Sequence, residues 1–124
     1  MSSYKTLAEL SGGPKKSQQE NFTQVPEITS MDDKKALIAN NKLVVVDIYA
    51  SWCSPCQAMI PAYAKLYDKY KDLCIIVKEN VELRLSPTVT VVPTFIVFID
   101  GTLKHQIINN IDEVEKVIKT ELRL

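Results

Sequence analysis

The chain lacks several features that would place it in a common class of protein. Its 15 lysines and arginines balance 15 aspartates and glutamates, so the formal net charge is zero. A neutral balance gives no electrostatic reason to expect nucleic acid or an anionic membrane as a partner. No apolar run approaches the roughly 18 residues needed to span a bilayer, and the N-terminal MSSYKT has no apolar signal core. We therefore expect a cytoplasmic protein without a membrane partner.

Cysteine is also scarce, with three residues in the whole chain and no spacing typical of a disulfide framework. This argues against a secreted domain held together by disulfides. In a reducing compartment, a Cys-x-x-Cys pair is more often catalytic or metal-binding than structural. The length of 124 residues, 46% of them hydrophobic, is enough for one domain with a proper core.

Residues 1–23 differ in composition from the rest of the chain. The run from Ser11 to Asn21 is polar and holds two of the three glycines, which is typical of a loop or a flexible extension. An arm that docks onto a partner is the alternative. The remaining residues, 24–124, are expected to fold as one domain.

Apolar patterning predicts alternating strands and helices in this domain. The predicted strands are 22–28, 43–49, 73–78, 94–99 and 103–108. The predicted helices are 31–40, 59–70 and 111–122. Pro26 restricts the first strand to a sheet edge, strands joined through helices run parallel, and Asp100-Gly101 predicts an antiparallel hairpin. The expected fold class is α/β, with a mixed sheet of about four to five strands and helices on both faces.

The stretch Trp52-Cys53-Ser54-Pro55-Cys56 lies where a buried strand ends and a helix begins. Two cysteines separated by two residues can close a small disulfide if the backbone between them turns helically. The start of a helix also supplies unpaired N–H groups and the positive end of its dipole, which favour a thiolate. The pattern therefore predicts a dithiol/disulfide redox site.

Two other interpretations of the cysteines remain open. The pair could be a buried dithiol without turnover, or part of a zinc site completed by Cys74 and His105. The chain offers no second Cys-x-x-Cys or His-x-His pair to complete a tetrahedral site. Cys74 lies in an apolar context and is expected to pack as a small hydrophobe. We expect no metal and no bound cofactor.

The chain closely resembles the thioredoxin family over roughly residues 24–124. The resemblance is carried by the Trp-Cys-x-Pro-Cys site at 52–56, Asp47 in the preceding strand, Pro61 in the following helix, Lys78 on the next strand and Pro93-Thr94 at the start of the hairpin. It implies a thioredoxin fold, here with a shortened third helix between Lys78 and Pro93. It also implies a cis peptide bond between Val92 and Pro93, with Pro93 against the cysteines.

The activity implied by the resemblance is thiol-disulfide exchange on protein disulfides. Cys53, expected to be the more exposed cysteine, would attack as a thiolate and form a mixed disulfide, which Cys56 would resolve. Burial of Asp47 is expected to raise its pKa. By resemblance, Asp47 would act as the general base for Cys56, and Lys78 would approach Asp47 and moderate its pKa.

Substrate contacts are expected around Cys53. The apolar rim there is predicted to consist of Trp52, Val91, Val92 and Pro93, with an extended peptide pairing to the backbone of Val92. Pro55 presets the backbone of the first helical turn. Ser54 replaces the glycine usual in thioredoxins but stays small, which indicates a reducing type of site.

The implied partners are proteins that contain disulfides and an electron donor resembling thioredoxin reductase. Two departures from the family pattern affect partner choice: Gln57 follows the second cysteine where a basic residue is common, and Asn109 replaces a glycine beside the peptide groove. They support an alternative hypothesis, in which the chain is a thioredoxin-fold binding or structural module. That module would sit in a larger assembly, docked through residues 1–23, with redox activity secondary.

Overall fold

The computed structural model describes residues 22–124, so the predicted extension lies outside the described residues except for Phe22 and Thr23. The elements in chain order are β1 (Glu27–Ile28), α3 (Met31–Asn40), β2 (Leu43–Tyr49), α4 (Ser54–Tyr70), β3 (Ile75–Asn80), the short 3-10 helix η1 (Val81–Leu83), β4 (Thr94–Ile99), β5 (Thr102–Ile108) and α5 (Ile111–Leu122). None of the described helices is long and apolar enough to cross a membrane.

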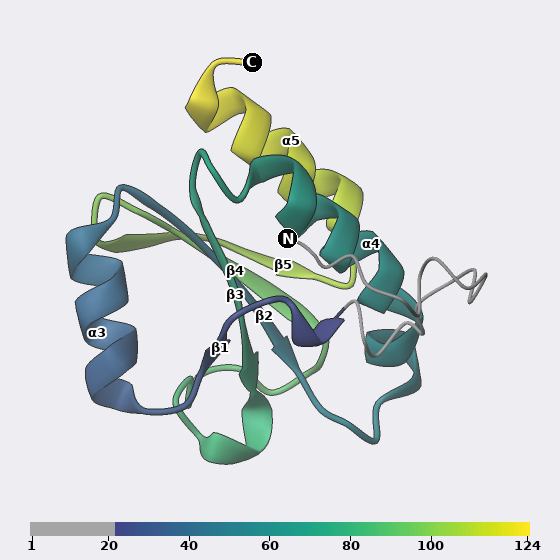
Figure 1. Cartoon of the computed structure of the whole chain (residues 1–124). Helices are drawn as coiled ribbons and strands as arrows, with labels where there is room; N and C mark the ends of the chain where they lie inside the picture. The colour runs from purple at the N-terminus through teal and green to yellow at the C-terminus, as the bar shows by residue number, and fades with distance from the viewer. Residues whose placement is uncertain (1–21) are drawn as a thin grey trace, which may run out of the picture.

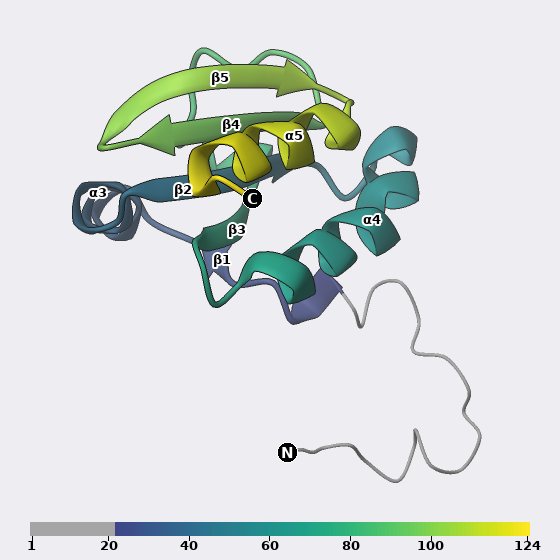
Figure 2. The ribbon, with the colours of Figure 1, turned by 90° about the horizontal axis from the view of Figure 1, so that it is seen from above.

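The strands form one mixed sheet in the order β1-β3-β2-β4-β5. β1 and β2 both run parallel to β3, whereas β4 runs antiparallel to β2 and to β5. Helix α3 covers one side of the sheet, and α4 and α5 lie together on the other side (Figure 1, Figure 2). The prediction of an α/β fold with a mixed sheet covered by helices on both faces is confirmed.

The central strand β2 explains how two core layers form. Its seven residues are apolar except for Asp47, and successive side chains of a strand point to opposite faces. Leu43 and Val45 pack in the layer under α4 and α5, whereas Val44 and Val46 pack in the layer under α3. The same alternation directs Asp47 towards the face that α4 covers.

Local signals in the sequence set the boundaries of several elements. Ser30 caps α3 because its hydroxyl accepts the N–H of Asp33 at 3.1 Å, and Asn110 caps α5 by accepting the N–H of Glu113 at 3.1 Å. The β4–β5 turn places Asp100 at φ 52° and Gly101 at φ 82°. Asp-Gly is suited to these left-handed positions, and the predicted hairpin is confirmed.

Two predicted strands differ from the structure. The edge strand expected over 22–28 has only two residues, Glu27–Ile28, because Phe22 and Thr23 are helical and Pro26 has no N–H to donate. Strand β3 begins two residues later than predicted and continues through Glu79 to Asn80. The shortened third helix is confirmed, since η1 is the only helical segment in the fully described stretch between β3 and β4.

Candidate active site

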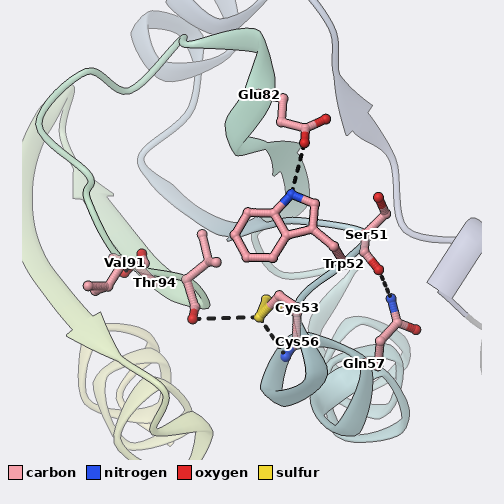
Figure 3. The surroundings of a disulfide bond; sticks show 9 residues. Ser51, Trp52, Cys53, Cys56, Gln57, Glu82, Val91 and Thr94 are labelled. Atoms are coloured by element: carbon pink, nitrogen blue, oxygen red, sulfur yellow. Dashed lines mark hydrogen bonds between the residues drawn. A yellow bond between two sulfur atoms is a disulfide. The ribbon is translucent and has the colours of Figure 1, made fainter.

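The cysteine pair lies at the junction of β2 and α4. Cys53 is the N-cap of α4, and its Sγ accepts the backbone N–H of Cys56 at 3.1 Å (Figure 3). The two residues are joined by a disulfide bond, so the structure represents the oxidised protein. The helical turn between the cysteines closes the small ring that the spacing predicts.

Burial does not distinguish the two cysteines in this state. Each is 5% exposed, so the expectation that Cys53 is the more exposed is wrong for the oxidised form. Their surroundings do differ. The Sγ of Cys53 lies 3.6 Å from the carbonyl oxygen of Val92, to which a reduced thiol can donate. Cys56 instead borders a cleft of about 280 Å³ that is also lined by Phe22 and Lys78.

The loop before β4 forms one wall of the site. The peptide bond between Val92 and Pro93 is cis, as predicted, and Val92 packs against the cysteine pair. The hydroxyl of Thr94 donates to the carbonyl of Val91 at 2.7 Å, and the N–H of Asn109 donates to the carbonyl of Pro93 at 3.0 Å. These two hydrogen bonds tie the loop to itself and to the end of β5.

Trp52 supplies exposed apolar surface next to Cys53. It is 68% exposed, and its indole N–H donates to Oε2 of Glu82 in η1 at 2.8 Å (Figure 3). Ser54 and Pro55 occupy the exposed first turn of α4. The sequence did not predict a role for Glu82. Its position in the short segment after β3, which the structure places beside Trp52, could have indicated one.

Gln57 has a local structural role. Its side-chain amide donates to the carbonyl of Ser51 at 3.0 Å (Figure 3). It therefore ties the first turn of α4 to the loop that precedes Cys53. The absence of a basic residue at this position leaves a neutral hydrogen-bond donor in its place.

Asp47 is a buried carboxyl group on β2, the strand that leads to the cysteine pair. It is 3% exposed, and burial raises its pKa to about 7, although the positive charge of Lys78 opposes part of that rise. Its Oδ1 accepts no hydrogen bond from residues 22–124. The predicted rise in the pKa of Asp47 is therefore confirmed, and this carboxyl group can gain or lose a proton near neutral pH.

Lys78 lies directly beside Asp47 in the parallel register of β2 and β3, and it is 5% exposed. Its Nζ donates to the carbonyl oxygen of Phe22 at 2.6 Å and lies 4.2 Å from the centre of the Phe22 ring. Burial lowers the pKa of this ammonium group. The backbones of Lys78 and Asp47 are therefore neighbours, as predicted. The ammonium group of Lys78, however, binds Phe22.

The structure does not bring the proposed zinc ligands together. Cys74 precedes β3 at the end where Val44 of β2 pairs with Ile75, whereas Cys53 and Cys56 follow the opposite end of β2. Burial raises the pKa of the Cys74 thiol to about 11. His105 lies on β5, paired with Val97. No group of three or more potential metal ligands occurs among residues 22–124.

Replacement of Asp47 by asparagine is expected to stabilise the oxidised protein at pH 8. The pKa of Asp47 is about 7 in the folded state against 3.8 for a free carboxyl group. Between these values the folded state holds a proton that the unfolded state has released. The free energy of unfolding therefore falls as the pH rises from 4 to 7. The gain at pH 8 is on the order of 4 kcal/mol.

Urea unfolding of the two proteins at pH 4 and pH 8 measures this effect. The difference should be much smaller at pH 4, where the folded-state carboxyl group is protonated and the unfolded-state group, with a pKa of 3.8, is only partly ionised. An equal difference at both pH values would contradict a buried carboxyl group that titrates near neutral pH.

Comparisons with known proteins agree with this site. A model of the thioredoxin family matches residues 24–121. Mitochondrial thioredoxin-3 of Saccharomyces cerevisiae is 34% identical over 122 residues, which cover 94% of this chain and 96% of the yeast protein. The crystal structure of its oxidised form superposes with a TM-score of 0.72 at 35% identity, covering 81% of this chain and 98% of the yeast chain. A structure of Plasmodium falciparum thioredoxin gives a TM-score of 0.70 at 27% identity, with 77% and 98% coverage.

The family match covers the whole described domain apart from its ends, and the Cys53–Cys56 disulfide lies at the expected junction of strand and helix. The chain belongs to the thioredoxin family and is a thiol-disulfide oxidoreductase that reduces protein disulfides.

Proposed function

We propose that Cys53 is the attacking thiol and Cys56 the resolving thiol. The observation that carries this assignment is the position of the Cys53 Sγ, which caps α4, accepts the N–H of Cys56 and faces the carbonyl of Val92. An N-cap thiolate is stabilised by the unpaired N–H groups and the dipole of its helix. Cys56 lies within the first turn of α4, bonded to the Cys53 sulfur, and borders the cleft shared with Phe22 and Lys78.

The reaction balances over two exchanges. The thiolate of Cys53 forms a bond to one sulfur of the substrate disulfide, the substrate S–S bond breaks, and the second substrate sulfur leaves as a thiolate. The thiolate of Cys56 then bonds to the Cys53 sulfur and releases the first substrate sulfur. Two electrons have passed to the substrate, and the Cys53–Cys56 disulfide remains.

Asp47 is the proposed base for the second exchange. Its carboxylate would take the proton of the Cys56 thiol and return a proton to the departing substrate thiolate. Its burial, its pKa of about 7 and its position on the sheet face under α4 support this role. Lys78 would act as the neighbouring charge that limits the rise in the pKa of Asp47.

The proposed substrate site is the surface around Cys53. An extended peptide would pair with the backbone of Val92, while Trp52, Val91 and Pro93 provide apolar contacts. The exposure of Trp52 and of Val91, at 68% and 46%, supports this proposal. Ser54 and Pro55 would contact the substrate from the first turn of α4. The Asn109 backbone has a φ of 48°, a left-handed conformation that asparagine tolerates.

A trapping experiment tests the division of roles between the cysteines. Replacement of Cys56 by serine removes the resolving thiol, so a disulfide-containing peptide should remain attached to Cys53. Mass spectrometry after reaction under non-reducing conditions measures the adduct and its position. The matched Cys53→Ser protein should form no such adduct at the active site. Equal trapping by both variants would contradict the assignment.

The electron donor is proposed to be a protein resembling thioredoxin reductase, and no bound cofactor is needed for the exchange. A reducing compartment is required for the dithiol form. We propose the cytoplasm, while the yeast relative, named as mitochondrial, provides the competing location. Fractionation of the source cells with antibodies against the chain distinguishes the two.

The binding or structural hypothesis stays a prediction, as does docking through residues 1–23. Most of that segment lies outside the described residues. Its last two residues, Phe22 and Thr23, do belong to the folded part of the chain, and Phe22 is 8% exposed and packs into the core.

A further inference from the structure

Lys78 has two possible partners for its buried ammonium group. One is Asp47, which is its direct neighbour in the sheet register and points to the same face. The other is Phe22, whose carbonyl oxygen accepts from Nζ at 2.6 Å and whose ring centre lies 4.2 Å away. The ammonium takes the second partner, and no ion pair joins Lys78 to Asp47 within residues 22–124.

This choice leaves a buried carboxyl group without its nearest counterion. Unpaired buried charges are costly, so a lysine and an aspartate on adjacent strands are expected to pair when both are buried. Phe22 offsets that preference in two ways. Its carbonyl satisfies one N–H of the ammonium, and its ring attracts the cation through the negative charge of the aromatic face.

Other aromatic side chains hold the Phe22 ring in place. It meets Tyr49 edge to face, with centroids 5.1 Å apart, and Tyr63 at 6.5 Å. The hydroxyl of Tyr49 donates to Oε2 of Glu27 at 2.7 Å. These contacts place Phe22 at the wall of the cleft that Lys78 shares with Cys56.

We propose that Phe22 is a positioning residue that holds the ammonium of Lys78 away from the carboxyl group of Asp47. The effect on the protonation of Asp47 follows from charge alone. A more distant cation stabilises the carboxylate less, so Asp47 keeps its proton to a higher pH. The consequence for resolution by Cys56 rests in addition on the proposed role of Asp47 as its base.

Among residues 22–124, the surroundings of Asp47 contain few other charges that could produce the same effect. From β3 it faces Lys78, from α4 it faces Tyr63, and Tyr49 lies two residues further along β2. Glu27 of β1 acts on Lys78 by favouring its charged form. The tyrosines stay neutral because burial raises the pKa of each well above 10. Lys78 is therefore the cation whose distance from Asp47 can change the pKa of that carboxyl group.

Replacement of Phe22 by leucine tests the proposal in the full-length oxidised protein. Leucine keeps the backbone carbonyl that Lys78 binds but removes the aromatic face, so the ammonium is expected to shift part of the way towards Asp47. The pKa of Asp47, measured from its carboxyl carbon by NMR titration, should fall by about half a unit to one unit. The Lys78→Met variant should instead raise it, and adding Phe22→Leu to Lys78→Met should change nothing further.

Controls separate this effect from a loosened core. Val117→Ala removes apolar contacts of α5 in the same core cluster and should leave the pKa of Asp47 unchanged. An unchanged pKa in Phe22→Leu, or a shift that persists without Lys78, would overturn the proposal. The pH profile of disulfide reduction, measured on the same variants, isolates the catalytic step. If the pKa moves but the profile does not, Phe22 keeps its assignment and the role of Asp47 as base fails.

Discussion

Reduction of insulin disulfides by dithiothreitol is expected to fall to the uncatalysed rate when Cys53 is replaced by serine. The hydroxyl of serine is not ionised near neutral pH and cannot replace a thiolate as the attacking group. Removing the nucleophile of an enzyme costs about 1,000-fold in rate or more. Turbidity from the precipitating insulin chain measures the rate, with dithiothreitol alone as the baseline.

The matched control is replacement of Cys74 by serine. Cys74 borders a separate cleft of about 750 Å³ at the opposite end of the sheet, shared with Lys71 and Arg123, and burial disfavours its thiolate. This variant should keep full activity. Acceleration by the Cys53→Ser protein, or its loss in Cys74→Ser, would contradict reduction through the Cys53–Cys56 pair.

Replacement of Glu79 by glutamine is expected to give the largest loss of stability. Glu79 is fully buried on the α3 side of the sheet, where its Oε1 lies 2.9 Å from Nζ of Lys34 and its Oε2 accepts the hydroxyl of Ser86 at 2.7 Å. Glutamine keeps the shape but leaves the charge of Lys34 uncompensated. Breaking one side of a buried ion pair costs about 3–5 kcal/mol, which urea unfolding monitored by circular dichroism measures.

A double replacement shows whether the loss comes from the unpaired charge. The Lys34→Met/Glu79→Leu protein has neither ion, and apolar side chains of similar size often substitute for a buried pair without loss. It should recover most of the stability of the unchanged chain. The exposed pair of Lys69 and Glu115, 2.8 Å apart, offers a contrast, because Lys69→Met should have little effect. A double variant no more stable than Glu79→Gln would refute this account.

Much of the fold could be predicted because its strands are nearly pure apolar runs. The bounds of β2 and β4 agree with the predicted strands, because both strands are almost entirely apolar and Asp47 lies within β2 rather than at its end. The predicted end of β3 is too early because the strand continues into Glu79, and a charged residue normally marks the surface. The ion pair with the distant Lys34 and the hydrogen bond from Ser86 compensate the burial of Glu79, and no local pattern reveals the contact with Lys34.

Some residues of the site could also be predicted from the sequence, and others could not. The cysteines, Asp47 and the cis bond at Pro93 follow from short patterns and from the family resemblance. Glu82 and Phe22 escape sequence reasoning because each acts through one contact made across the fold, with Trp52 and with Lys78. Phe22 comes after a polar stretch, and its local pattern predicts only the start of a strand. Its burial depends on Tyr49 and Tyr63, which are far away in the sequence.

The alternation of Lys78 and Glu79 along β3 has a consequence for how the sheet assembles. Lys78 faces the side of Asp47, and Glu79 faces the side of Lys34. Slippage of β3 by one residue would exchange these faces. It would place Lys78 next to Lys34 and Glu79 next to Asp47, with like charges buried on both sides at once. Ile76 and Val77 are apolar and would fit on either face of the sheet. The two adjacent charges, by contrast, make the shifted register unfavourable and so fix the alignment of β3.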